Sequence, residues 1–88
     1  MSNSQIKTAD DVYRFVEFLK VQSEKGGLRE LATQLDDALH LGSSGLEILG
    51  AIRQTVIENR IAIEQMLGPS GKDETEQVIA FVDRAFGR

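Results

Sequence analysis

The chain of 88 residues contains no cysteine and only one histidine, and these shortages exclude several kinds of chemistry. Without cysteine there is no disulfide framework, no thiolate nucleophile and no cysteine-ligated zinc. The single histidine, His40, has no second histidine with which to complete a catalytic or di-metal site. We therefore expect a protein that is not an enzyme, with no catalytic residue, no metal and no cofactor.

Long apolar runs and an excess of positive charge are also missing. No stretch approaches the ~18 consecutive apolar residues of a membrane span, and residues 1–9 lack the apolar core of a signal peptide. The formal charge is −4, with five cations against seven anions in each half of the chain. Such a surface has no basic patch for nucleic acid or an anionic membrane. We expect a cytoplasmic protein that binds neither.

The residues that are present predict a small, all-α fold. Hydrophobic residues make up 41% of the chain, which argues against disorder, and its length allows one domain. Apolar positions recur with the helical period, and eight glycines against one proline favour helices separated by glycine-rich breaks. We predict an antiparallel four-helix bundle over residues 8–88, after a flexible lead over 1–7. Its helices would cover about 8–25, 28–41, 44–67 and 72–86.

The first two helices carry clear end signals. Thr8 is a good N-cap, and Gly26-Gly27 supplies the positive φ that ends a helix. The helix over 28–41 is amphipathic with one narrow apolar stripe, and Gly42 is the residue expected to follow its end. The expected core positions of the two helices are Val12, Phe15, Val16, Leu19, Leu28, Leu31, Ala32, Leu35, Ala38 and Leu39.

The stretch over 44–67 predicts the longest helix and the centre of the fold. Ser44 and Glu47 have the spacing of a capping box. The apolar seam expected to face the core consists of Leu49, Ile52, Val56, Ile63 and Met66. The same register places Asn59 on this seam, where a polar side chain needs hydrogen-bond partners.

This long helix has a second apolar stripe, formed by Leu46, Gly50, Ile57 and Ile61, with Arg53, Arg60 and Glu64 beside it. So wide an apolar surface needs more than one neighbour to cover it. Two interpretations remain open: the other helices of the same chain cover the second stripe, or a second copy does so in a two-fold dimer. In the dimer, either arginine could pair with Glu64 across the interface.

Gly68-Pro69-Ser70-Gly71 is expected to separate the long helix from the last one. Ser70 with Asp73 is a plausible cap for a helix starting near residue 72. The expected core positions of that last helix are Val78, Ile79, Phe81, Val82, Ala85 and Phe86.

Together these features favour a non-enzymatic helical interaction or adaptor module that forms a homodimer through the long third helix. The interface would comprise Leu46, Gly50, Arg53, Ile57, Arg60, Ile61 and Glu64. An alternative is a small acidic regulator, of the immunity-protein or antitoxin type, that binds a basic protein. It would present Glu30, Asp36 and Asp37, or the acidic residues over 73–76, as a charged rim.

A third alternative comes from His40 and the Gly42-Ser43-Ser44 that follows shortly after it. This short segment superficially resembles histidine phosphotransfer domains, which are also four-helix bundles. Those domains keep the histidine in mid-helix with a lysine at a fixed offset, whereas here a loop begins two residues later and no lysine follows. A histidine near a helix C-terminus is otherwise expected to lie at the surface, where the helix dipole favours its cation.

Overall fold

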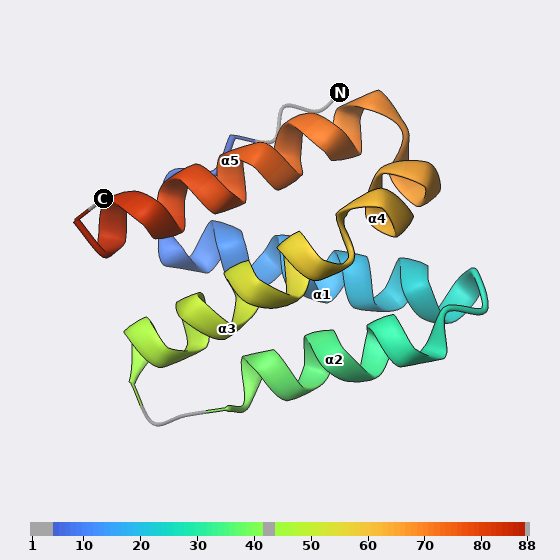
Figure 1. The fold of residues 1–88 in the computed structure, drawn as a ribbon, viewed down its shortest axis with the longest axis horizontal. Helices are drawn as coiled ribbons and strands as arrows, with labels where there is room; N and C mark the ends of the chain where they lie inside the picture. Colours follow the sequence, from blue (N-terminus) through green and yellow to red (C-terminus); the bar gives the residue numbers. More distant parts are fainter. Residues whose placement is uncertain (1–4, 42–43, 88) are drawn as a thin grey trace.

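The computed structural model describes residues 5–41 and 44–87, which form five α-helices and no strand. These are α1 (Ala9–Lys25), α2 (Arg29–Leu39), α3 (Gly45–Glu58), α4 (Arg60–Leu67) and α5 (Pro69–Ala85). The helices α1, α2, α3 and α5 run in alternating directions, and α4 forms a short corner between α3 and α5 (Figure 1). The prediction of an all-α fold is confirmed. The predicted count of four helices is wrong, because the stretch over 44–67 is divided in two.

The first hairpin follows the sequence signals closely. Thr8 Oγ1 accepts from the backbone N–H of Asp11, and the Asp11 carboxylate accepts from the N–H of Thr8, so both halves of a capping box are present. The backbone N–H of Lys7 also donates to this carboxylate, and these bonds lower the pKa of Asp11. Gly27, with φ of 78°, then turns the chain into α2. Residues Gly42 and Ser43 lie outside the described residues, so the predicted end signal at Gly42 does too.

The predicted continuous helix over 44–67 is interrupted at Asn59. Its start is as expected, since Ser44 Oγ accepts from the N–H of Glu47. At Asn59 the backbone has φ of −113° and ψ of 19°, and the chain turns sharply into α4. Asn59 Nδ2 donates to the Thr55 carbonyl oxygen, four residues back, and to Gln34 Oε1 on α2, each at 2.8 Å. A short polar side chain that bonds the preceding turn competes with the helix, which explains a break without glycine or proline.

The last helix begins earlier than predicted. Gly68, with φ of 77° and ψ of −163°, is the whole connection between α4 and α5. Pro69 occupies the first position of α5, where its missing N–H costs nothing. The predicted start near residue 72 and the predicted cap at Ser70 are therefore wrong. Gly71 is buried, and a Cβ there would overlap Leu67 of α4, which shows that the two helices meet at a tight corner.

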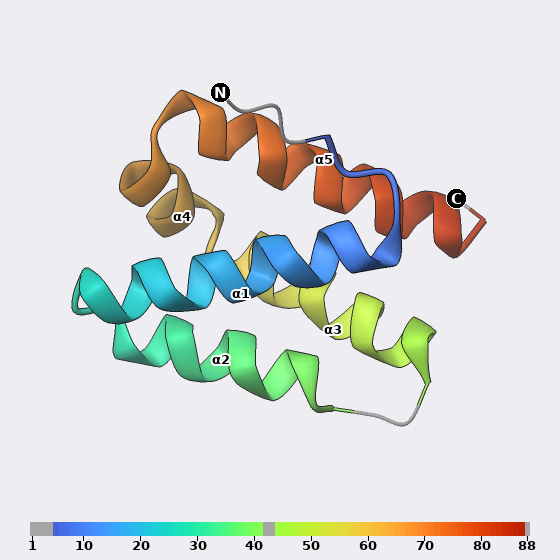
Figure 2. The ribbon, with the colours of Figure 1, turned by 180° about the vertical axis from the view of Figure 1, so that it is seen from behind.

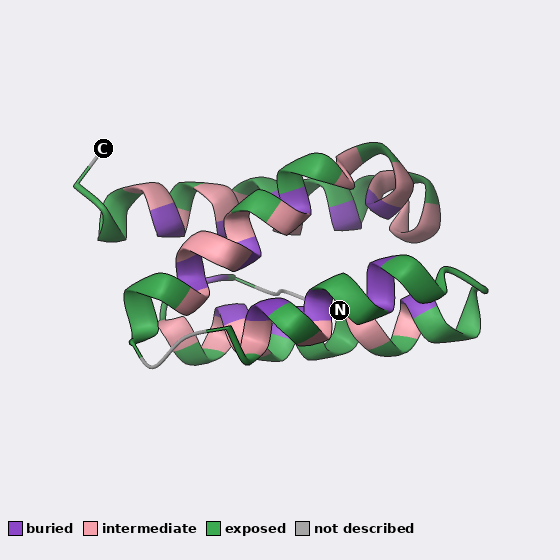
Figure 3. Ribbon diagram, turned by 60° about the horizontal axis from the view of Figure 1, so that its bottom comes forward, coloured by how far each residue is buried: buried purple, intermediate pink, exposed green. Residues whose placement is uncertain are grey.

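The core draws on every helix (Figure 3). Side chains without exposed surface come from α1, α2, α3, α4 and α5, and include Leu19, Leu35, Ile52, Ile63, Val78 and Val82. Ile6, which precedes α1, is also buried, and its N–H donates to Gln77 Oε1 of α5. The segment before α1 thus runs along α5 (Figure 2). None of the helices described here is long and apolar enough to cross a membrane.

Candidate interaction surface

The second stripe of the long segment is only partly covered within the chain. Leu46, Ile57 and Ile61 retain 49%, 38% and 73% of their surface. Gly50, between them, is half-buried. The structure thus leaves the larger side chains of this stripe in contact with solvent.

Helix α5 covers the middle of the stripe. The Phe86 ring lies 3.4 Å from where a Cβ on Gly50 would stand, and Arg53 Nε lies 2.7 Å from Asp83 Oδ1. Gly50 thus lies next to Phe86, just after α5, and Arg53 lies next to Asp83. Residue numbers rise along α3 where they fall along α5, so the two helices run antiparallel. Leu46 lies one turn before Gly50, beyond the end of α5 at Ala85, and α5 cannot cover it.

The charged residues beside the stripe have partners within the chain. Arg53 and Asp83 form an ion pair whose side chains are both more than two-thirds buried. Arg60 bonds Glu64 at 3.0 Å and Glu76 of α5 at 2.8 Å. Both arginines and Glu64 therefore have an oppositely charged partner within the chain, and the pairs of Arg53 and Arg60 link α3 and α4 to α5.

The break at Asn59 changes the position of Ile61. In a continuous helix Ile57 and Ile61 would lie one turn apart on the same side. After the break the axis of α4 diverges from that of α3 (Figure 1), and Ile61 is the most exposed large hydrophobic residue among those described. The predicted straight stripe is therefore bent.

Three residues that the sequence pattern assigns to the core are exposed in the structure. Phe86 and Ala85, expected in the core, are exposed at the end of α5, and Leu28 is exposed as the N-cap of α2. Phe18 and Val21, which lie outside the core stripe of α1, are also exposed. Helix ends have neighbours on one side only, and no local sequence signal marks which end residue is covered.

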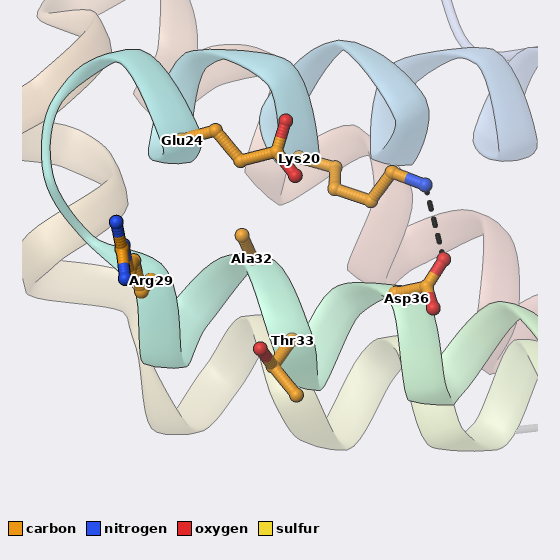
Figure 4. A pocket seen from close by; sticks show the side chains of 6 residues that line it. All are labelled: Lys20, Glu24, Arg29, Ala32, Thr33 and Asp36. Atoms are coloured by element: carbon orange, nitrogen blue, oxygen red, sulfur yellow. Dashed lines mark hydrogen bonds and ion pairs between the residues drawn. The ribbon is translucent and has the colours of Figure 1, made fainter.

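A groove of about 580 Å³ lies between α1 and α2 (Figure 4). Its lining alternates in charge, with Lys20 and Arg29 against Glu24 and Asp36. Lys20 Nζ bonds Asp36 Oδ1 at 3.0 Å, which raises the pKa of Lys20 and lowers that of Asp36. Because the opposite charges lie next to one another at the surface, this groove presents no field of one sign to a ligand.

The acidic residues of the alternative interpretation are dispersed. Asp36 pairs with Lys20, Glu76 with Arg60, and Asp73 accepts from Gln77 Nε2. Glu74 instead lines a second groove of about 450 Å³, together with Ile6 and Phe18. Two members of the rim proposed for a basic partner, Asp36 and Glu76, are therefore paired with cations of the same chain.

His40 lies at the exposed C-terminal end of α2, where its Nδ1 is 2.8 Å from the Asp36 carbonyl oxygen. A ring in this position contacts the last turn of its own helix. Over residues 5–41 and 44–87, no group of three acidic, histidine or cysteine side chains has the arrangement of a metal site.

Comparisons with known proteins add no assignment: no family model, no curated protein and no solved structure matches this chain.

Proposed function

We propose that this protein is a non-enzymatic helical interaction module that associates with a second copy of itself. The observation that carries the proposal is the exposure of Leu46, Ile57 and Ile61 along α3 and α4. Burying such side chains removes apolar surface from water, at about 25 cal/mol per Å². A stable interface buries about 800 Å² on each partner, so the stripe needs flanking residues to contribute.

A second copy suits this surface better than a strongly charged partner. The ion pair between Arg53 and Asp83 places opposite charges beside the stripe, and Arg60 is paired with Glu64 and Glu76. A surface whose charges are matched within the chain is not repelled by its own copy. A strongly charged partner would gain little electrostatic attraction from this surface, because its charges are already paired.

The test compares the solution mass of the wild type with that of Ile57→Glu and Ile61→Glu. Both variants place a carboxylate where the proposal buries an isoleucine, so the mass should fall to half at concentrations where the wild type is dimeric. Thr33→Glu introduces the same side chain at an exposed polar position of α2, away from the stripe, and should keep the wild-type mass. Circular dichroism checks that all three variants stay helical. A monomeric wild type, or glutamate variants that keep its mass, would contradict the proposal.

A further inference from the structure

The break between α3 and α4 is only one residue wide. Helix α3 ends at Glu58 and α4 begins at Arg60, and neither glycine nor proline occurs over residues 51–67. Asn59 has an ordinary negative φ. Its N–H still donates to Thr55 O at 3.1 Å, and its carbonyl accepts from Ile63 N–H at 3.0 Å. The backbone on each side is therefore already helical, and nothing in its covalent structure prevents a continuous helix.

Side-chain bonds and packing hold the bend. The Asn59 amide bonds to Thr55 O and to Gln34 of α2, and Ile63 of α4 is fully buried. Straightening would release these interactions within one chain. It would also give the first N–H groups of α4 the helical partners that a helix start lacks. In addition, it would bring Ile57 and Ile61 onto one side of a single helix.

A straightened chain cannot keep α5 in its present place. Helix α5 supplies Val78 and Val82, both fully buried, and it holds Arg53 through Asp83. If α4 and α5 swing away, this core opens. A second copy that opens in the same way offers an identical surface on which α5 can pack, and two straight helices can then cover the Ile57 and Ile61 side chains of each other.

We propose that Asn59 is a hinge at which two copies exchange α4 and α5. This inference rests on the proposed self-association and specifies its form: the contacts of α5 with α3, including the pair of Arg53 with Asp83, are made between copies. Exchange of an identical element requires no new complementary surface, only a hinge with two acceptable conformations.

The first experiment changes the hinge alone. Asn59→Ala and Asn59→Gly both remove the amide bonds that hold the bend, but alanine favours a continuous helix and glycine does not. After refolding at high concentration, the dimer dissociation constant of Asn59→Ala should be at least about tenfold lower than that of Asn59→Gly. Light scattering over a dilution series measures both. Equal constants would overturn the hinge proposal.

The second experiment asks whether the dimer is an exchanged one. In the Asn59→Ala background, one chain carries Arg53→Asp and another carries Asp83→Arg, so each alone has like charges at this contact. When the two are refolded together, an exchanged mixed dimer has opposite charges at both contacts. Native mass spectrometry should therefore count mixed dimers well above the statistical half.

A control pair, Lys72→Glu with Asp37→Lys, makes the same net charge changes at exposed positions and should give the statistical proportion. A chain with both Arg53→Asp and Asp83→Arg shows whether the reversed pair supports folding. Dimers with no excess of mixed species over the control would overturn exchange and leave self-association standing. Monomers at every concentration, for the wild type and for Asn59→Ala, would overturn both proposals.

Discussion

Helices α2 and α3 lie next to each other in the same core, yet the chain covers them to different extents. The single apolar stripe of α2 is buried through Leu31, Ala32, Leu35 and Ala38, and its other side is polar. Helix α3 buries Leu49, Ile52 and Val56 in the same way, but it carries part of a second stripe that α5 and the Phe86 after it cover only at Gly50, beside the pair of Arg53 with Asp83. The helices of this chain thus cover one apolar stripe on each of these two helices and leave the large side chains of the second stripe exposed.

The largest expected effect on stability comes from truncating a fully buried leucine of α2. Leu35 of α2 has no exposed surface, so Leu35→Ala should lower the free energy of unfolding by about 2–5 kcal/mol. Leu46→Ala removes the same atoms from a half-exposed site on α3 and should cost well under half as much in the monomer. Urea titration of both variants measures the difference. Equal losses would mean that Leu46 is as covered as Leu35.

A smaller effect concerns how α5 is attached to its neighbours. A Cβ at Gly71 would overlap Leu67, so Gly71→Ala should destabilise the corner between α4 and α5 by about 1–3 kcal/mol. Gly50→Ala places its methyl group in ordinary contact with Phe86 and should be neutral or stabilising, because alanine favours the helix by up to about 1 kcal/mol. Thermal unfolding of the two variants ranks them. A larger loss of stability for Gly50→Ala than for Gly71→Ala would contradict the tight corner between α4 and α5.

The smallest effect compares helix starts. Ser44 Oγ caps α3, so Ser44→Ala should cost about 1 kcal/mol. Ser70 was expected to cap the last helix but lies inside the first turn of α5 after Pro69. Ser70→Ala should therefore change stability by less than about 0.5 kcal/mol. A loss of about 1 kcal/mol for Ser70→Ala in the same urea titration would instead support a last helix that starts near residue 72 with Ser70 as its cap.

The sequence predicts the elements whose signals are local. The all-α class, α1 with its cap at Thr8, and the buried stripe of α2 follow from periodicity, caps and glycines within a few residues. The break at Asn59 does not, because one of the two bonds that hold it comes from Gln34, 25 positions away. The start of α5 was misplaced because proline suits the first position of a helix as well as the loop before it.

The candidate surface was predictable in its residues but not in its shape. The double apolar pattern of the long segment identifies Leu46, Ile57 and Ile61 without any structure. Which of these α5 covers depends on the register between α3 and α5, which the contacts of Gly50 with Phe86 and of Arg53 with Asp83 define. Such a register depends on packing between helices distant in sequence, so no local pattern encodes it.

The most direct test of the central claim, that a second copy covers what α5 leaves exposed, is sedimentation equilibrium of the unmodified protein over a wide concentration range. If two copies associate, the mass should rise with concentration from 9.7 kDa towards twice that value. A mass that stays at one chain up to the highest soluble concentration would contradict it.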